Sequence, residues 1–319
     1  MVESAGRQLA VRLTAIDSNG LLPLRAADRP YGSAHAFRRG LQKQLPEHLG
    51  VAPATQPLRG KRLPSGAGIP RRVNDQWPAV SLAALSDPAT VARMPIDHGV
   101  PPVAHRGGAK AALAELTSFL DERLPRYAEE RNHTDAGAVS GLSPWLHWGH
   151  ISVHHVLREL ARREQWNPGR HAARASGSRA GWWGMSASAE AFLDQIVTWR
   201  ELGYNMAADR SDHDRYESLP DWARATLTDH EADPRPALYT LGQLEAAETD
   251  DPLWNAAQRQ LRIEGRIHNY LRMLWGKKVI EWTRSAPEAL DCLIELNNRW
   301  AVDGRDPNSY SGIFWCFGR

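Results

Sequence analysis

Apolar residues recur every three or four positions from Gly108 to Trp300, and no stretch in between alternates apolar with polar residues. The first spacing places side chains on one face of an α-helix, whereas alternation is typical of a half-buried strand. Leu113, Leu116 and Leu120, for example, share one helix face. The chain is therefore predicted to be mainly α. The expected helices cover residues 111–123, 153–163, 187–208, 219–230, 240–248, 252–264, 266–283 and 286–300.

The residues before this region lack the helical period. Leu9–Leu24 (LAVRLTAIDSNGLLPL) predicts a short strand, a turn at Asp17–Gly20 and a second extended piece. No partner strand is encoded nearby, so the strand either pairs with a sheet encoded elsewhere or lies along the helical body. Residues 51–106 are rich in Pro, Gly, Ala and Arg and predict a long irregular linker.

Several classes of protein are excluded by the sequence. No run of about 18 apolar residues occurs, which argues against a membrane span, and no apolar secretory segment follows the first residues. The two cysteines, Cys292 and Cys316, form no CxxC pair, which favours a reducing, cytoplasmic setting. Walker A, GxGxxG and GxSxG motifs are missing, so a conventional kinase or hydrolase is unsupported. We expect a monomer that binds no metal.

Positive charge is concentrated near the N-terminus. The net charge is only +2, yet residues 1–72 carry twelve Lys and Arg against four Asp and Glu, which leaves 27 against 33 in the rest. Such asymmetry is typical of an arm that faces nucleic acid. The alternative is a solvated, poorly ordered basic segment, which composition alone favours.

Tryptophan is unusually frequent, with 13 Trp against 5 Phe and 7 Tyr. Trp275 and Trp282 are seven residues apart in Gly265–Thr283, so they share a helix face about 10.5 Å apart along the axis. Trp254, at the start of the preceding helix, extends this row if the two helices pack. Aromatic rings in a row suit stepwise electron transfer. Ordinary core packing is the alternative, and the spacing alone favours it.

Polar residues gather in the tail Leu296–Trp315, around glycines and a proline. This composition predicts a loop that contacts a ligand, or alternatively a well-capped turn. The polar residues are Asn297, Asp303, Arg305, Asp306 and Asn308.

Two weaker signals lie at the start of the helical region. Ser140–Ser143 (SGLS) offers hydroxyls and backbone N–H groups before an apolar helix, which suits a phosphate or simply caps the helix. The other signal is the group His147, His150, His154 and His155. His150 and His154 have a spacing that metal ligands use, but no carboxylate or cysteine accompanies them. We therefore interpret these histidines as surface or core-edge residues.

Taken together, these segments resemble the photolyase/cryptochrome family, and class II cyclobutane pyrimidine dimer photolyases in particular. The resemblance runs from about Gly107 to Trp315, and AIDSNGLLPLR also resembles the end of the family's N-terminal domain. It implies a remnant of an α/β antenna domain in residues 1–50, a linker in 51–106, and a helical FAD-binding and DNA-lesion domain in 107–319. The matching blocks are SGLSPWLHWGHIS, FLDQIVTWREL, ALYTLGQLE, DPLWNAAQRQL, GRIHNYLRMLWGKKVIEWT and VDGRDPNSYSGIFW, in which Val302 replaces the usual leucine.

The resemblance also implies FAD as cofactor. Arg272 and Asp303 are similar to the family's buried ion pair beside the flavin ring, and Asn297 to the amide that faces flavin N5. The row Trp254, Trp275 and Trp282, with Tyr239 nearby, resembles the class II photoreduction chain. No antenna chromophore can be named, because most of the antenna domain is missing from the chain. The residues expected at the phosphates and ribityl chain are Tyr127, Ser140, Leu142 and Ser143.

UV-damaged DNA is the partner that the resemblance implies. Trp199 and Trp315 are expected to form opposite walls of a lesion pocket, with Asn269 and Met273 at its floor. Indole walls would replace the stacking that a flipped dinucleotide loses, worth about 1–3 kcal/mol per base. The implied reaction is splitting of the cyclobutane ring by an electron from light-excited reduced FAD, with return of the electron.

Departures from the family pattern keep other functions open. Gln195 stands where the family has a glutamate toward the dimer, and an amide supplies neither a proton nor a negative charge. The sequence after Trp315, CFGR, also departs from the family motif. The alternatives are a cryptochrome-like flavoprotein that senses light or carries electrons without repair, and an inactive remnant.

Overall fold

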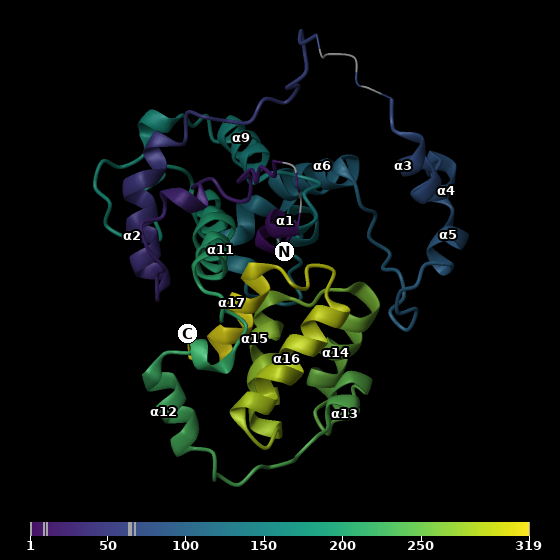
Figure 1. Ribbon diagram of the computed structural model, residues 1–319. Coiled ribbons are helices and arrows are strands. Elements are labelled where there is room, and N and C mark those ends of the chain that lie inside the picture. The colour runs from purple at the N-terminus through teal and green to yellow at the C-terminus, as the bar shows by residue number, and fades with distance from the viewer. Residues whose placement is uncertain (1, 9, 11, 63–65, 67, 319) are drawn as a thin grey trace. The chain divides into compact units, whose positions relative to one another are not determined.

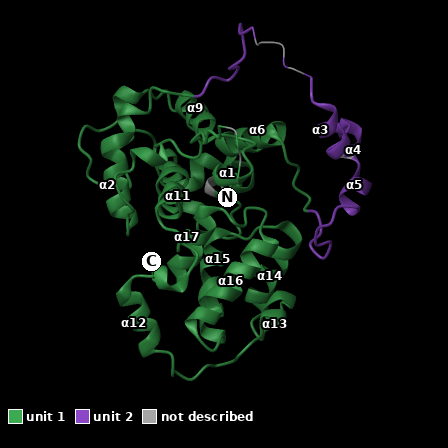
Figure 2. Ribbon diagram, viewed as in Figure 1, with its two compact units in different colours: residues 1–52, 103–319 green, residues 53–102 purple. Residues whose placement is uncertain are grey.

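The computed structural model describes residues 2–8, 10, 12–62, 66 and 68–318 (Figure 1). Contacts divide the chain into two compact units, residues 1–52 with 103–319, and residues 53–102 (Figure 2). Throughout the described residues the regular structure is helical and no strand is assigned. The prediction of a mainly α fold is confirmed. No helix in this part of the chain has the length and apolar character needed to cross a membrane.

The smaller unit, residues 53–102, contains three short helices, α3 (Arg71–Gln76), α4 (Leu82–Ser86) and α5 (Pro88–Ala92). Helices this short have little stability without packing. Trp77 and Ile69 are nonetheless exposed. The irregular linker predicted for residues 51–106 therefore contains more helix than expected, while its large apolar side chains remain in contact with solvent.

The helices of the larger unit include all those predicted from residue 108 onward. The predicted helix 187–208 is one continuous run in which a π-helical segment, η6 (Asp194–Trp199), joins two α-helices. A second π segment, η3 (Phe119–Arg123), ends the first predicted helix. The α-helices are α1 (Val2–Gln8), α2 (Ala34–Gln44), α6 (Ala109–Ser118), α7 (Tyr127–Glu130), α8 (Ser143–His147), α9 (Val153–Arg163), α10 (Ala187–Leu193), α11 (Arg200–Asp209), α12 (Asp221–Asp229), α13 (Leu241–Ala246), α14 (Pro252–Glu264), α15 (Asn269–Trp282), α16 (Ala286–Trp300) and α17 (Pro307–Cys316).

The strand predicted within Leu9–Leu24 is wrong for its described residues, which exclude positions 9 and 11. A strand needs a partner for its backbone groups, and in the second extended piece, after the turn at Asp17–Gly20, a side chain takes that part. The N–H groups of Leu21 and Leu22 donate to the buried carboxylate of Glu201 on α11, at 2.7 and 3.1 Å. Gly20 lies so close to this carboxylate that a Cβ would be 2.7 Å from Glu201 Cδ.

Two further buried contacts fix residues 1–52 to the helical body. Arg38 on α2 forms an ion pair with Asp194, with Nε and Oδ1 2.8 Å apart and both side chains buried. The Asn205 amide accepts from the N–H of Tyr31 and donates to the carbonyl of Arg29, both at 3.0 Å. This segment therefore completes the core of the larger unit, to which α2 contributes Phe37.

The loop predicted for the tail Leu296–Trp315 is wrong for residues 307–316, which form α17. Asp306 caps this helix by accepting from the N–H of Asn308 at 2.8 Å, and Pro307 occupies the first helical position, where no N–H is needed. α17 packs along α11 so closely that a Cβ on Gly203 would lie 2.8 Å from the Pro307 carbonyl oxygen. Only the turn at residues 301–306 remains as predicted.

The buried carboxyl of Glu201 predicts a pH-dependent stability. Burial raises the pKa of Glu201 from 4.5 to about 7, although the N–H groups of Leu21 and Leu22 oppose this rise. The folded chain retains a proton that the unfolded chain releases between these two values, so stability decreases as the pH rises through that window. The shift corresponds to roughly 3 kcal/mol in the free energy of unfolding.

A Glu201→Gln variant removes this titration. We expect the difference in unfolding free energy between wild type and variant to change by about 3 kcal/mol between pH 4.5 and pH 8, in favour of the variant at high pH. Urea unfolding of both proteins at the two pH values measures this difference. An equal difference at both would show that the carboxyl keeps an ordinary pKa.

Candidate functional site

A cation, an amide and a carboxylate meet where α15, α16 and the turn 301–306 come together. Arg272 on α15 donates from Nη1 to Asn297 Oδ1 at 3.2 Å, and its Nη2 lies 3.6 Å from Asp303 Oδ1. All three side chains are largely removed from solvent, and Asn297 is only 2% exposed. Asp303 Oδ1 is buried but accepts no hydrogen bond from any described residue. A buried acceptor normally has a donor, so this oxygen indicates a ligand with a donor group.

The turn that carries Asp303 is held in place by the main chain. The N–H of Val302 donates to the carbonyl of Gly265, which ends α14 in a left-handed conformation at φ 69°. Gly304 lies over the end of α16, where a Cβ would be 2.9 Å from the Asn297 carbonyl oxygen. Glycine is therefore required for the turn to bring Asp303 back beside Asn297.

Three tryptophans form a buried row next to this polar group. The rings of Trp275 and Trp254 are stacked, with centroids 6.2 Å apart and planes 5° from parallel. Trp254 and Trp282 follow at 5.6 Å, and Trp282 meets Tyr239 edge-on at 5.4 Å. Sequence reasoning placed Trp254 at the end of the row, whereas packing of α14 on α15 inserts its ring between the other two.

The row runs from the interior toward the surface. Trp275 follows Arg272 by three positions on α15, so both lie on one side of the helix. Its indole N–H donates to Gln258 Oε1 at 3.0 Å, in a fully buried contact. At the other end Tyr239 is half-buried, and its hydroxyl donates to the exposed Asp250 at 2.9 Å. The aromatic side chains therefore form a row of neighbouring rings from Trp275, one turn along α15 from Arg272, to the half-buried Tyr239.

The residues predicted at the flavin phosphates lie around the start of α8. Leu142 is buried as the residue before the helix, while Ser143 is exposed as its first residue. The N–H of Leu142 donates to Ser140 Oγ at 3.4 Å. Arg123 supports this segment by donating to the Val139 carbonyl at 3.2 Å.

Tyr127, also predicted at the flavin phosphates and ribityl chain, packs in an aromatic cluster. Its ring meets Phe119 and Phe192 edge-on at 5.6 and 5.7 Å. Burial raises the pKa of Tyr127 to about 12, so the hydroxyl remains a hydrogen-bond donor at neutral pH. No hydrogen bond joins Tyr127 to Ser140–Ser143 in the described structure.

The side chains predicted to face a lesion come from two places. Gln195 and Trp199 both lie in the π segment η6, and both are half-buried. Trp315 on α17 is 43% exposed, with Lys277 Nζ 5.5 Å from its ring. Met273 is half-buried on α15 beside Trp315's helix, and Asn269 begins α15 in an exposed position. Single-turn π segments are frequent at functional sites, and nothing in the apolar spacing indicated this one.

Sequence reasoning also missed a polar network centred on Asp306. One of its carboxylate oxygens accepts from the Tyr204 hydroxyl at 2.9 Å and lies 3.0 Å from His147 Nδ1. Burial raises the pKa of Asp306, but the hydrogen bonds from His147 and the N–H of Asn308 outweigh it, and the net shift is downward. The carboxylate therefore stays charged and ties α8 to α11 and α17. The sequence offered a well-capped turn here as an alternative, but it indicated neither α17 nor these distant partners of Asp306.

Three of the four histidines at residues 147–155 have a contact within the chain, His147 with Asp306 as described above. His150 Nδ1 accepts from the N–H of Gly108 at 3.1 Å, and Arg158 lies 2.7 Å from His155 Nδ1. Over the described residues, no three His, Cys, Asp or Glu side chains are arranged to hold a metal ion.

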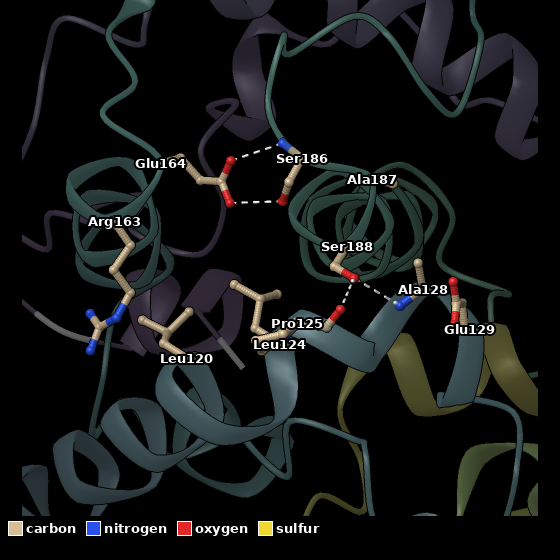
Figure 3. Close-up of a pocket in the computed structure, with 10 residues that line it drawn as sticks. All are labelled: Leu120, Leu124, Pro125, Ala128, Glu129, Arg163, Glu164, Ser186, Ala187 and Ser188. Carbon is tan, nitrogen blue, oxygen red and sulfur yellow. Dashed lines mark hydrogen bonds between the residues drawn. The ribbon is translucent and has the colours of Figure 1, made fainter.

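A cavity of about 460 Å³ lies apart from all these residues, and Figure 3 shows its lining. Glu164 accepts from the N–H and hydroxyl of Ser186 at 2.8 and 2.7 Å. Ser188 bridges Pro125 and Ala128 by two hydrogen bonds. The main polar groups at this cavity are therefore already partnered, and none of the predicted site residues lines it.

Several named proteins are similar to this chain in sequence. It is 34% identical to the deoxyribodipyrimidine photo-lyase of Methanothermobacter thermautotrophicus over 319 residues, which are 100% of this chain and 63% of that protein. It is 41% identical to the deoxyribodipyrimidine photo-lyase of Potorous tridactylus over 208 residues, 65% of this chain and 36% of that protein. The chain thus spans less than two thirds of either relative. No protein-family model matches it.

Solved structures show the same fold at lower identity. A class III photolyase from Agrobacterium tumefaciens superposes with a TM-score of 0.57 at 20% identity, over 94% of this chain and 54% of that one. A cryptochrome from Synechocystis gives a TM-score of 0.50 at 20% identity, over 71% and 42% of the two chains. The helical fold of this chain is therefore one that these two solved structures also adopt.

Proposed function

Because the chain belongs to the photolyase/cryptochrome family, we propose that its larger unit is the flavin-binding catalytic part of a deoxyribodipyrimidine photo-lyase, which splits cyclobutane pyrimidine dimers in light. The observation that carries this proposal is the buried group of Arg272, Asn297 and Asp303 at the end of a tryptophan row. A structural core has no need of a buried carboxylate oxygen without a donor.

The residues present fit FAD. Asp303 Oδ1 would accept from the imide N–H of the flavin ring, which is the kind of donor that this oxygen lacks. Arg272 lies 3.6 Å from Asp303 and holds the Asn297 amide through its Oδ1. Asn297 Nδ2 donates to Asn298 Oδ1 at 3.5 Å and has a second N–H for the ring. Ser140, Leu142 and Ser143 would hold the phosphates through hydroxyl and N–H groups. FAD, when bound and reduced, supplies the electron that opens a pyrimidine dimer.

The tryptophan row gives the proposed site a path for electrons from solvent. Ring contact from Tyr239 through Trp282 and Trp254 to Trp275 is unbroken. Burial excludes water from the three indoles, which lowers the reorganisation that accompanies a moving charge. The class II assignment, the antenna chromophore and the three-part division into residues 1–50, 51–106 and 107–319 stay predictions.

Substrate binding would use the π segment and α17. Trp199 and Trp315 supply stacking surfaces for a dinucleotide that has left the duplex. Gln195 would donate to or accept from the exposed edge of a pyrimidine, without providing a charge. UV-damaged DNA is therefore the proposed partner, and Lys277 beside Trp315 adds a cation for its phosphates.

Gln195 favours a second candidate function, a flavoprotein that senses light or carries electrons without repair. A protonated carboxyl in this place would donate a hydrogen bond to the negative charge that the dimer gains with the electron, and the amide of Gln195 is a weaker donor. If the chain is a repair enzyme, Gln195→Glu should increase the rate of dimer splitting, by about tenfold for each 1.4 kcal/mol of added stabilisation.

Dimer splitting under blue light, measured on FAD-loaded protein with an oligonucleotide that contains one thymine dimer, separates the two functions. A repair enzyme splits the dimer in its wild-type form and splits it faster as Gln195→Glu. Flavin bands with no splitting in either protein would assign the sensing function instead. Trp199→Ala in the Gln195→Glu background serves as the control that removes a stacking wall.

A further inference from the structure

The tyrosine at the outer end of the tryptophan row has its hydroxyl bound to a carboxylate. Tyr239 donates to Asp250 Oδ2 at 2.9 Å and accepts from the N–H of Asp250 at 3.0 Å. Because that N–H occupies a lone pair of the hydroxyl, the phenolic proton is directed at the carboxylate. The N–H of Tyr239 itself donates to the Trp282 carbonyl at 3.1 Å. A donor and an acceptor for one proton are therefore aligned next to Trp282.

Side-chain contacts hold the segment that carries Asp250. The Asn255 amide donates to the Thr249 carbonyl at 2.6 Å and accepts from the N–H of Thr249 at 3.1 Å. The following residue, Asp251, caps α14 by accepting from the N–H of Leu253 at 3.0 Å. Asp250 thus lies between two fixed residues, which keeps its carboxylate within reach of the tyrosine hydroxyl.

The three tryptophans of the row, in contrast, have no neighbour that could take a proton. Trp275 donates to the amide oxygen of Gln258 at 3.0 Å, and Trp254 donates to the main-chain carbonyl of Trp275 at 3.0 Å. Trp282 is buried, and its indole N–H makes no hydrogen bond among the described residues. Amide and peptide oxygens accept hydrogen bonds but are not bases that hold a proton at neutral pH. An oxidised indole of the row therefore keeps its proton, and the first carboxylate that can receive one is at Tyr239.

We propose that Asp250 is the proton acceptor for Tyr239 when Tyr239 supplies an electron to the tryptophan row. The inference rests on the proposed function, in which Trp275 loses one electron to light-excited oxidised flavin and is refilled through Trp254 and Trp282. As Tyr239 gives an electron to the oxidised Trp282, its O–H bond breaks and the proton goes to Asp250 Oδ2. The products are a neutral Trp282, a neutral tyrosyl radical and a protonated Asp250, so protons and charge balance.

The proton transfer gives the row a direction. Return of the electron to the tyrosyl radical requires return of the proton from Asp250 as well, which slows the reverse reaction. Tyr239 is half-buried, so a reductant in solution can reach it in the meantime. Asp250 therefore acts on the reacting hydroxyl itself and favours lasting reduction of the flavin over recombination.

Formation of the tyrosyl radical after a light flash on FAD-loaded protein tests the acceptor. Asp250→Asn keeps the main-chain N–H and a side-chain oxygen for Tyr239 but removes the base, so the radical should form about 100-fold more slowly. In the wild type, formation should be slower in D2O than in H2O, because a proton moves with the electron. Transient absorption measures the rate, electron paramagnetic resonance identifies the radical, and Tyr239→Phe gives the background from other tyrosines.

Glu248→Gln is the matched control. Glu248 is exposed, lies two positions before Asp250 and makes no hydrogen bond to Tyr239 in the described structure. Its replacement removes the same charge and should leave the wild-type rate unchanged. An equal decrease in both variants would mean that lost charge is the cause. A wild-type rate in Asp250→Asn would mean that water takes the proton, and either result overturns the proposal.

A measurement without flavin separates this inference from the proposed function. A flash-generated ruthenium(III) polypyridyl complex removes one electron at a time from the flavin-free chain, and the difference between wild type and Tyr239→Phe reports the radical at Tyr239. Asp250→Asn should slow its formation here too. A chain that retains no flavin but shows this decrease refutes the proposed function and keeps Asp250 as the acceptor. Flavin that is retained and reduced in light, with no decrease in Asp250→Asn, refutes the inference alone.

Discussion

Replacement of Trp282 by Phe should slow the light-driven reduction of bound FAD at least tenfold, which corresponds to about 1.4 kcal/mol in the barrier. Trp282 joins the half-buried Tyr239 to the buried Trp254, so its loss separates the inner tryptophans from the surface. Its indole N–H makes no hydrogen bond among the described residues, and a phenyl ring keeps most of the packing. FAD binding should therefore remain close to wild type. Absorbance at the flavin bands during blue illumination with a reductant measures the rate.

Trp183 provides the matched control. It is also buried and lies in the separate cluster with Trp166 and Trp182, outside the row. Trp183→Phe should leave the photoreduction rate unchanged. Equal rates in the wild type and in Trp282→Phe would show that the row is core packing alone. Trp275→Phe should also slow the reduction with FAD binding nearly intact, but it leaves Gln258 without a buried donor and lowers stability by about 1–3 kcal/mol.

Replacement of Arg38 by Ala should lower the free energy of unfolding by about 3–5 kcal/mol, because it leaves Asp194 as an uncompensated buried charge. The ion pair joins residues 1–52 to the π segment, so the change also releases the segment that packs on the helical core. Urea unfolding followed by far-UV circular dichroism measures the loss.

Arg39, one position further and exposed, is the control for Arg38. Arg39→Ala should change stability by less than about 0.5 kcal/mol. The double replacement Arg38→Met/Asp194→Leu removes both charges and should recover most of the stability that Arg38→Ala loses. If Arg38→Ala is no less stable than Arg39→Ala, residues 1–52 are not held by this pair.

The helices predicted from residue 111 to residue 300 were found because each buries a face whose spacing is visible in the sequence, whereas α2 was not predicted. α14, α15 and α16 match their predicted ranges to within about three residues, as expected for ends set by caps. α17 was missed because its polar cap and proline resemble turn chemistry. The strand predicted before the turn at Asp17–Gly20 was wrong, and in the extended piece after it a distant carboxylate on α11 takes the hydrogen bonds of Leu21 and Leu22.

Much less of the site could be predicted from spacing alone. Periodicity placed Trp275 and Trp282 on one face, but the position of Trp254 between them depends on how two helices pack. The contact of Arg272 with Asn297 and Asp303 joins elements far apart in sequence, and only the family resemblance indicated it. The Asp306 network likewise depends on long-range contacts that local pattern does not encode.

An absorption spectrum of the purified chain, incubated with FAD, freed of excess cofactor and recorded before and after blue light with a reductant, tests the central claim most directly. The proposed flavin site predicts retained flavin bands that bleach on illumination. In Asp303→Ala, which removes the acceptor proposed for the flavin, the retained flavin should decrease. A wild-type chain that retains no flavin would contradict the account, and would leave Arg272, Asn297 and Asp303 as a buried polar group without a cofactor.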